Sequence, residues 1–194
     1  ALEEVRVTAE RRGKPLRETP ISLVNFGESS LAARNYRDLS DLRGGIPNLQ
    51  LIPHPNAEST LLLFVRGVGN PDEQLIQDPS VAVYIDGIYL PRSQGLASEA
   101  AALQRIEVLR GPQGTLYGRN ATGGAVNLVT VAPDLDRLTL TQTLRTGSRD
   151  LFRSRTDLNV PLPGQAALRL GYVESREVGA IDNPGTGEGR YGDR

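Results

Sequence analysis

The stretch of sequence that decides the fold covers residues 106–130 and reads IEVLRGPQGTLYGRNATGGAVNLVT. Residues 105–109 alternate with a period of two, which is typical of a strand. Asn120 and Asn127 can form hydrogen bonds with nearby backbone in turns. The stretch is also rich in glycine, which lacks a Cβ and lets the backbone turn tightly and pack closely against neighbouring chain. These glycines are Gly111, Gly114, Gly118, Gly123 and Gly124. The stretch therefore predicts a strand that leads into a compact, irregular segment.

The residues before this stretch alternate between short strand patterns and short helix patterns. Asp86 and Gly87 separate two apolar runs, and Asp-Gly supplies the positive φ angles that a two-residue hairpin turn requires. The predicted elements are a strand at 21–26, a helix at 28–42, a buried strand at 61–66, a polar loop at 67–79, a hairpin at 80–90 and an Ala-rich helix at 98–103. Such a mixture in one domain predicts the α+β class, with a small mixed β-sheet and short helices.

After Pro133 the pattern consists of period-two segments alone. Apolar and polar residues alternate at 138–144, 158–162 and 168–172, with turn-forming residues at 147–150 and 161–164. Strands of this kind fit antiparallel wall strands of a β-barrel. They also fit a soluble sheet that packs one face on a core, and alternation by itself does not separate the two.

Composition excludes several classes of protein. Lys and Arg number 22 against 23 Asp and Glu, so the chain has no basic excess for binding nucleic acid. Without Cys there is no disulfide framework and no Cys-based metal site. No apolar run approaches the ~18 residues of a transmembrane helix. Ala1 is not followed by a charged n-region and an apolar h-region, so we expect no signal peptide in this sequence.

Residues 106–130 closely resemble the signature of the plug domain of TonB-dependent outer-membrane receptors. Residues 64–68 (FVRGV) and 78–88 (DPSVAVYIDGI) resemble two further segments of that family, in the same order. Residues 4–9 (EVRVTA) look like the TonB box, although Arg6 stands where the family more usually has an apolar residue. The resemblance covers residues 3–132 well and the rest more loosely. It implies a compact plug that fills a barrel of about 22 strands.

The resemblance divides the chain into three parts. We expect a TonB-box-like segment and linker at 1–16, a plug domain at 17–133, and barrel wall strands at 134–194. A barrel of about 22 strands needs roughly 220 residues in strands alone. Residues 134–194 supply about three strands and the start of a long polar external loop. We therefore expect an incomplete antiparallel barrel in this chain.

The function implied by the resemblance is energy-coupled import of a scarce nutrient, such as a ferric siderophore. The expected location is the Gram-negative outer membrane, with the plug in the barrel lumen and the N-terminus in the periplasm. The implied partners are TonB with its inner-membrane energising complex, a small nutrient ligand, and the outer membrane through a full-length barrel. No nucleic acid is expected as a partner.

The TonB-binding residues implied by the match are Glu4, Val5, Arg6, Val7, Thr8 and Ala9. They would pair edge-on with a strand of TonB through main-chain hydrogen bonds. The alternating β-branched residues of this segment fit an edge strand of the following domain equally well.

Two further sets of residues follow from the match. The candidate ligand-binding residues, for which solvated turn residues are the alternative, are Arg66, Gln74, Tyr89, Arg92, Ser93 and Gln94. Glu107 and Arg110 are the candidate plug–barrel contacts. In the family, the arginine that matches Arg110 pairs with carboxylates on the inner wall of the barrel. The alternative is an ion pair between Arg110 and Glu107, or another carboxylate, inside the plug.

Catalysis and cofactor binding have weak signals in this sequence. The glycine-rich stretch lacks the Gly-Lys-Ser/Thr of a phosphate-binding loop. His54, the single histidine, lies between two prolines, so neither a histidine cluster for a metal nor a convincing triad can be built. Asp72, Glu73 and Asp78 fit a solvated acidic loop better than a Ca²⁺ site. We expect no enzyme and no cofactor. The alternative function is a freestanding plug-like module that binds TonB or a ligand without transport.

Overall fold

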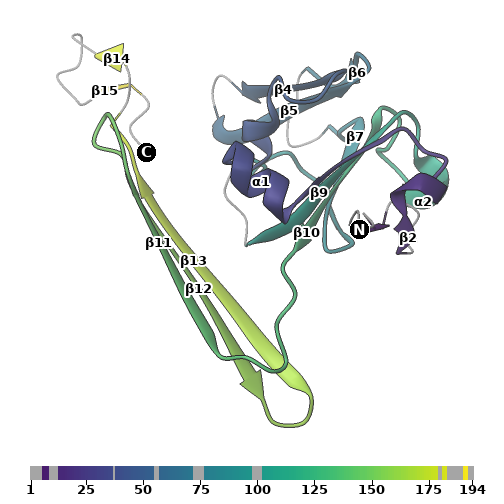
Figure 1. The fold of residues 1–194 in the computed structure, drawn as a ribbon. Coiled ribbons are helices and arrows are strands. Elements are labelled where there is room, and N and C mark those ends of the chain that lie inside the picture. The colour runs from purple at the N-terminus through teal and green to yellow at the C-terminus, as the bar shows by residue number, and fades with distance from the viewer. Residues whose placement is uncertain are drawn as a thin grey trace. The chain divides into compact units, whose positions relative to one another are not determined.

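The computed structural model describes residues 6–8, 13–36, 38–54, 57–71, 77–97, 102–178, 181–182 and 190–191. The chain divides into two compact units, residues 1–131 and residues 132–194 (Figure 1). The division falls close to Pro133, where the sequence changes from mixed patterns to period-two patterns alone.

The first unit is built around a five-stranded sheet with the strand order β3-β9-β10-β7-β8. Strands β7 and β10 are parallel, whereas the other neighbouring pairs are antiparallel, so the sheet is mixed. The strands are β3 (Leu23–Gly27), β7 (Val81–Ile85), β8 (Ile88–Leu90), β9 (Leu103–Arg110) and β10 (Gly124–Thr130). Together with the short helices described below, this arrangement confirms the predicted α+β class.

The larger core lies on one face of this sheet. The side chains of strand β9 point alternately to the two faces of the sheet, and Ile106 and Val108 are fully buried in the larger core. The core also includes buried residues of several other elements, which are helix α1 (Glu28–Arg34), a 3₁₀ helix (Leu39–Leu42) and the strands β4 (Leu49–His54) and β5 (Ala57–Val65). Strand β6 (Val68–Gly69) completes a second sheet with the order β4-β5-β6.

The opposite face of the five-stranded sheet carries a smaller apolar cluster. Its buried members are Val7, Ala82, Tyr84, Leu109, Tyr117, Ala121 and Ala125. They come from the sheet, from helix α2 (Gly114–Tyr117), from the connection between α2 and β10, and from β1 (Arg6–Val7). Strand β1 pairs with β2 (Lys14–Pro15), which is followed by a 3₁₀ helix (Leu16–Glu18). Both faces of the sheet are therefore covered by other parts of the first unit. The site described below lies on the second face.

The predicted hairpin at 80–90 is confirmed. Asp86 and Gly87 have φ angles of 49° and 82° between β7 and β8. A positive φ at both central residues is the geometry that the Asp-Gly pair predicts.

Two predictions of helices need correction. The predicted helix at 28–42 is wrong in length, because α1 ends at Arg34 and Asn35 adopts the left-handed conformation with a φ of 56°. The Asp38 side chain then accepts hydrogen bonds from the backbone of Ser40 and Asp41 and begins a separate 3₁₀ helix. In the predicted helix at 98–103, residues 98–101 lie outside the described residues, and Leu103 already begins β9. The predicted loop at 67–79 contains the short strand β6.

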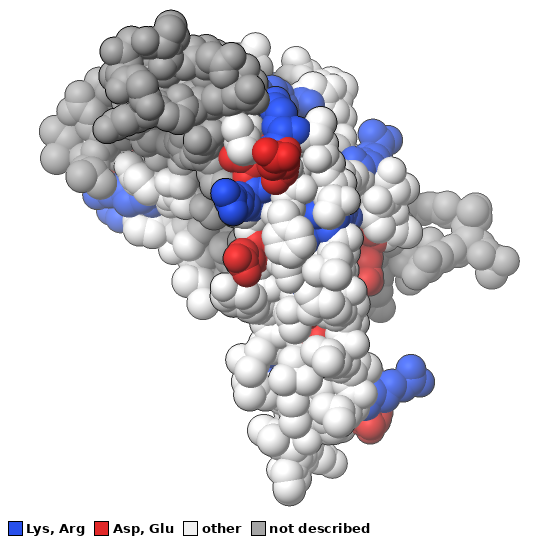
Figure 2. All heavy atoms as spheres, turned by 90° about the vertical axis from the view of Figure 1, so that its left-hand side faces the viewer, with Lys and Arg blue, Asp and Glu red and all other residues white. Residues whose placement is uncertain are grey.

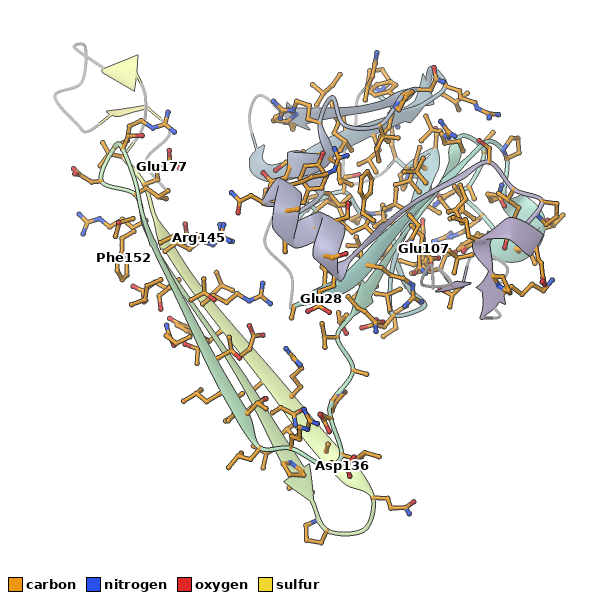
Figure 3. All side chains as sticks on the ribbon, viewed as in Figure 1. Glu28, Glu107, Asp136, Arg145, Phe152 and Glu177 are labelled. Carbon is orange, nitrogen blue, oxygen red and sulfur yellow. The ribbon has the colours of Figure 1, made fainter. Side chains whose placement is uncertain are left out.

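The second unit contains three antiparallel strands in the order β11-β12-β13. They are β11 (Thr139–Thr146), β12 (Phe152–Leu162) and β13 (Ala166–Arg176), followed by the short pair β14 (Ile181–Asp182) and β15 (Arg190–Tyr191). Figure 3 shows side chains standing out on both sides of the long strands. The described sheets are not closed, which confirms the predicted incomplete set of antiparallel wall strands.

The register of these strands sorts the side chains by chemistry. Leu140, Leu158 and Leu170 lie side by side across the three strands. On the other face, Arg155 donates to Asp157 at 2.7 Å, and Arg169 lies 3.9 Å from the same carboxylate. The middle of one face thus carries leucines and the middle of the other carries charges, as the period-two pattern predicts.

The connection into the second unit is held by Asn159. This residue is 1% exposed, and its Oδ1 accepts a hydrogen bond of 2.8 Å from the backbone N–H of Asp134. Its Nδ2 donates to the carbonyl oxygens of Asp134 and Arg137 at 2.9 and 2.6 Å. The buried amide is thus satisfied at both ends, and it fixes residues 134–137 against β12.

Within the described ranges, no helix is both long and apolar enough to cross a membrane.

Candidate functional site

A row of polar residues crosses the second face of the five-stranded sheet. The strand registers place Asn25, Glu107, Asn127 and Tyr84 next to one another on β3, β9, β10 and β7. Residues paired directly across a sheet point to the same face. The neighbouring row, two residues along, is apolar and contains Leu23, Leu109, Ala125 and Ala82. The polar row therefore lies at the border of the smaller apolar cluster.

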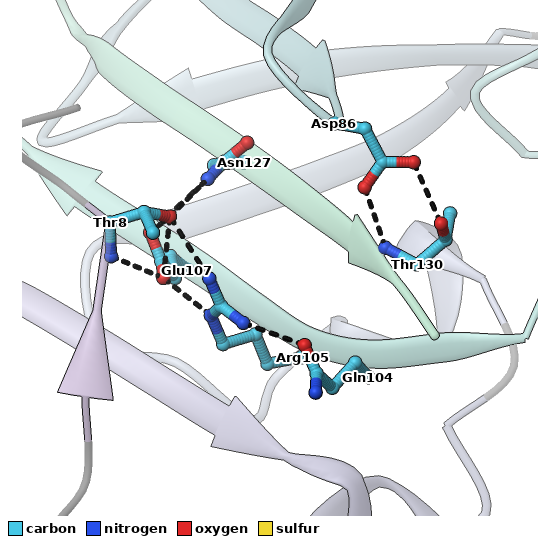
Figure 4. A network of polar contacts seen from close by, with 7 residues as sticks. All are labelled: Thr8, Asp86, Gln104, Arg105, Glu107, Asn127 and Thr130. Carbon is cyan, nitrogen blue, oxygen red and sulfur yellow. Dashed lines mark hydrogen bonds and ion pairs between the residues drawn. The ribbon is translucent and has the colours of Figure 1, made fainter. Parts of the chain in front are cut away.

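Glu107 is the centre of this row and has no exposed surface. A buried carboxylate is costly unless it is paired and hydrogen-bonded. Arg105, two residues earlier on the same face of β9, donates from Nε to Glu107 Oε1 at 2.8 Å. Asn127 donates from Nδ2 to Glu107 Oε2 at 3.2 Å. Figure 4 shows these side chains meeting between the strands.

The N-terminal segment completes the network through Thr8. Its backbone N–H donates to Glu107 Oε1 at 2.8 Å, and its hydroxyl donates to the same oxygen at 3.1 Å, across 99 positions of sequence. The Thr8 hydroxyl accepts hydrogen bonds of 3.1 Å from Arg105 Nη2 and from Asn127 Nδ2. The Thr8 hydroxyl thus uses its one donor hydrogen and both of its acceptor positions. The contact holds the N-terminal segment on the sheet.

Val7 adds an apolar contact to the same segment. It is 1% exposed and belongs to the smaller apolar cluster. Its strand β1 is short, since only Arg6 and Val7 pair with β2. Of the predicted TonB-binding residues, Glu4, Val5 and Ala9 lie outside the described residues. The described part of the segment is therefore docked on the first unit through Val7 and Thr8.

Some of the predicted ligand-binding residues lie close to one another at one end of the sheet, and the others lie elsewhere. Arg92 pairs with Asp78 at 3.3 Å, and Arg119 lies 3.9 Å from the same carboxylate. Tyr89 accepts a hydrogen bond of 2.6 Å from Asn120. These residues lie where β8 ends and where β7 and β10 begin, so loops distant in sequence meet at this end of the sheet.

The other candidates are placed less closely together. Arg66 lies in the turn between β5 and β6, and a Cβ on Gly111 would come within 3.2 Å of its Nη1. Ser93 is buried, whereas Gln94 is exposed. Gln74 lies outside the described residues.

Arg110 and Glu107 lie on opposite faces of β9, because they are three residues apart in a strand. Arg110 Nη1 donates to the carbonyl oxygen of Pro47 at 3.4 Å. Its Nε is buried and has no hydrogen-bond partner among the residues that the structure describes. The alternative of an ion pair between Arg110 and Glu107 is therefore wrong.

Sequence reasoning missed the roles of Arg105 and Thr8 and the second carboxylate of the region, Asp86. Asp86 accepts hydrogen bonds from the backbone N–H of Thr130 at 2.8 Å and from its hydroxyl at 2.7 Å (Figure 4). The usable signal was in β9, where Arg105 and Glu107 alternate with the apolar residues Ile106 and Val108. Charges on one face of an otherwise buried strand indicate a partner on that face.

The described residues offer no obvious metal centre. No group of three or more His, Cys, Asp or Glu in the described ranges lies close enough to hold a metal ion. Asp72 and Glu73 of the acidic loop lie outside those ranges. On the face shown in Figure 2, positive and negative side chains are interspersed.

Comparisons with known proteins give the relationship of the chain. Among curated relatives, the pesticin receptor of Yersinia pestis is 37% identical over 152 residues, which are 74% of this chain and 22% of that protein. The metal-pseudopaline receptor CntO of Pseudomonas aeruginosa is 43% identical over 72 residues, covering 37% of this chain and 10% of that protein. The chain thus spans about a fifth of the length of the first of these relatives.

Solved structures match over most of the chain. The ferric yersiniabactin uptake receptor FyuA from Yersinia pestis superimposes with a TM-score of 0.73 at 30% identity, covering 89% of this chain and 27% of the receptor. The pyoverdine outer membrane receptor FpvA from Pseudomonas aeruginosa gives a TM-score of 0.74 at 22% identity, over 91% of this chain and 25% of that one, and shows the shared fold. The family model described as TonB-dependent Receptor Plug Domain matches residues 15–125. The chain therefore belongs to the family of TonB-dependent receptor plug domains.

Proposed function

We propose that this chain is the plug and the first wall strands of an outer-membrane receptor that imports a scarce nutrient, such as a ferric siderophore, with energy from TonB. The observation that carries the proposal is a short N-terminal strand held on a family-matched plug through Val7 and Thr8. Relatives named as the pesticin receptor and the ferric yersiniabactin uptake receptor support the nutrient class. The proposed parts are the segment 1–16, the plug 17–133 and the wall strands 134–194.

The proposed contact with TonB uses the main chain of residues 4–9. An extended segment can add to the edge of a partner sheet, so that backbone hydrogen bonds provide affinity. In the docked arrangement, the backbone N–H of Thr8 is occupied by Glu107 at 2.8 Å. A strand of TonB would therefore have to take this segment away from the network.

The proposed ligand site uses the loops around Arg66, Gln74, Tyr89, Arg92, Ser93 and Gln94. The pairing of Arg92 and Arg119 with one carboxylate, Asp78, supports a polar surface at this end of the sheet. For the plug–barrel contact we propose Arg110, because its buried Nε lacks a partner among the described residues. Glu107 was predicted for the same role, but its carboxylate is already used by Thr8, Arg105 and Asn127.

The proposed location is the outer membrane, with the N-terminus of the plug in the periplasm. A relative named as an iron-regulated outer membrane virulence protein, from Vibrio cholerae, is 29% identical over 134 residues and supports this location. We propose no catalytic activity and no resident cofactor, in line with the relatives, which are named as receptors. A freestanding binding module is not favoured, since the match with FyuA extends over 89% of this chain.

The test is binding of the full chain, in detergent, to the periplasmic domain of TonB. We expect Val7→Pro to abolish binding, because proline removes a backbone donor and restricts φ within the pairing segment. Val7→Ile is the matched control, since it keeps the donor and the preference for strand. Equal binding by both variants would refute the docking role of this segment.

A further inference from the structure

The turn between β7 and β8 contains the single Asp-Gly pair of the sequence, Asp86 and Gly87. Both residues are exposed, and their φ angles are 49° and 82°. An aspartate that precedes glycine is prone to isoaspartate formation, because glycine has no side chain to shield its backbone nitrogen from the aspartate carboxyl group. The sequence therefore places the most reactive aspartate of the chain in this turn.

In the folded chain the Asp86 carboxylate is held by Thr130. The backbone N–H of Thr130 donates to Asp86 Oδ1 at 2.8 Å, and its hydroxyl donates to Oδ2 at 2.7 Å (Figure 4). Asp86 donates its own backbone N–H to the carbonyl oxygen of Leu128 at 2.9 Å. In a parallel pair of strands, a residue that donates in this way receives the next hydrogen bond on its backbone carbonyl. Here the side-chain carboxylate receives it instead, because the chain turns at Asp86.

This arrangement holds the carboxylate away from the nitrogen with which it would react. The strand order β10-β7-β8 places Thr130 on one side of β7, whereas Gly87 leads the chain to β8 on the other side. Isoaspartate formation needs the Asp86 side chain to turn back to the Gly87 nitrogen and one carboxyl oxygen to leave. Each of the two oxygens is bound to Thr130, so both hydrogen bonds must break before the reaction begins.

We propose that Asp86 is a site of isoaspartate formation and that Thr130 protects it while the first unit is folded. In the neutral acid form of Asp86, the Gly87 nitrogen attacks Cγ of the side chain. The new N–C bond forms, the C–OH bond breaks, and the hydroxyl leaves as water with the proton of the N–H. Water then opens the five-membered ring at either carbonyl carbon. Opening at the former backbone carbonyl leaves the main chain running through Cγ, which is isoaspartate.

The product does not fit this turn. Isoaspartate adds one carbon atom to the main chain, and its free carboxylate is attached directly to Cα, so it no longer reaches Thr130 in the same way. The two-residue turn depends on its backbone geometry, and β8 pairs with β7 through three residues only, Ile88, Tyr89 and Leu90. We therefore expect faster amide hydrogen exchange in β8 of the modified chain than in β8 of the native chain.

The first experiment incubates the full chain folded in detergent and, separately, unfolded in concentrated urea. Digestion followed by electron-transfer mass spectrometry distinguishes isoaspartate from aspartate at each position. We expect isoaspartate to form at Asp86 at least about fivefold faster in urea, because the hydrogen bonds to Thr130 are lost there. Asp136, an exposed aspartate followed by arginine, is the internal control and should stay unmodified. No isoaspartate at Asp86 in urea would refute the site, and equal rates in the two conditions would refute the protection.

Two variants test the roles of Thr130 and Gly87 separately. Thr130→Val removes the hydroxyl and should raise the rate in the folded chain about fivefold, the effect of one hydrogen bond, with no change in urea. Thr139→Val, on β11, is the matched control and should change neither rate. Gly87→Asn suits the positive φ and shields the backbone nitrogen, so it should slow the reaction at Asp86 in urea.

The outcomes of the variants are decisive in both directions. A folded Thr130→Val chain that reacts at the native rate would refute the protection by the hydroxyl. A Gly87→Asn chain that reacts at the native rate in urea would refute the assignment to the Asp-Gly pair. If Thr130→Val does not fold, the comparison of the folded and unfolded native chain decides the protection.

Discussion

The five-stranded sheet of the first unit and the three-stranded sheet of the second unit both contain strands with a period-two pattern, and these strands lie in different environments. In the first unit, Ile106 and Val108 face the larger core while Leu109 faces the smaller cluster, so the central strand β9 is covered on both sides. In the second unit, Leu140 and Leu170 are 69% and 52% exposed although their register aligns them on one face. Alternation fixes which residues share a face, whereas covering elements decide whether that face is buried.

The largest expected effect concerns the charge buried in the first sheet. We expect Glu107→Ala to destabilise the first unit by about 3–5 kcal/mol, because it leaves Arg105 and the backbone N–H of Thr8 without their shared partner. The measurement is amide hydrogen exchange in β9 and β10. Glu18→Ala, at an exposed position of the same unit, is the control. A loss below about 1 kcal/mol would mean that this network contributes little to stability.

The second prediction compares equivalent truncations in the two sheets. Ile106→Ala should cost about 2–4 kcal/mol in the first unit, since it leaves a cavity in a closed core. Leu170→Ala should change the stability of the second unit by less than about 0.5 kcal/mol in detergent, because the side chain is half exposed. Hydrogen exchange measured separately for β9 and β13 gives both values. Similar costs at the two positions would show that the exposed face is covered in solution.

The third prediction concerns a substitution that weakens the docking of the N-terminal segment and changes no residue of the five-stranded sheet. Thr8→Val keeps the shape of the side chain and removes its hydroxyl, which donates to Glu107 and accepts from Arg105 and Asn127. We expect the docked state to lose about 1 kcal/mol, and TonB affinity to rise several-fold as a result. Thr8→Ser, which keeps the hydroxyl, should behave like the native chain. A lower affinity for TonB in Thr8→Val would show that the hydroxyl contributes to TonB binding rather than to holding the segment on the first unit.

The smallest effect on folding is expected on the exposed apolar face. Leu140→Lys should leave the stability of the second unit nearly unchanged, since the side chain is 69% exposed. It should reduce self-association in dilute detergent, because exposed apolar strands promote association. Analytical ultracentrifugation measures the change. Thr141→Lys, on the opposite face, is the control, and an equal reduction there would attribute the effect to charge alone.

Local features of the fold could be predicted from the sequence, because their causes lie within a few residues. The hairpin at Asp86 and Gly87 and the three long strands follow from turn chemistry and from period-two alternation. The break between α1 and the following 3₁₀ helix was missed, because apolar spacing continues through Asn35 and Asp38, where local hydrogen bonds end one helix and begin the next.

The candidate site was harder to predict, because its contacts are distant in sequence. Thr8 and Glu107 are 99 positions apart, and no local pattern connects them. The resemblance made both residues candidates, Thr8 for binding TonB and Glu107 for a contact between plug and barrel. In the fold this carboxylate accepts hydrogen bonds from Thr8 and from Asn127, which the register of β9 and β10 places beside it.

The hydrogen bonds between the Asn159 side-chain amide and the backbone of residues 134–137 have a consequence for protein engineering. Because Asn159 binds the backbone of Asp134 and Arg137, the segment between them is part of the second unit in structure as well as in sequence. A graft that joins a foreign plug at residues 131–133 would leave these hydrogen bonds intact. A graft placed a few residues later would replace the segment whose backbone satisfies this buried amide, and the new segment would have to present its N–H and carbonyl groups in the same places. We therefore expect residues 131–133, just before the segment that Asn159 binds, to be the place where a chimeric receptor can be joined with these hydrogen bonds intact.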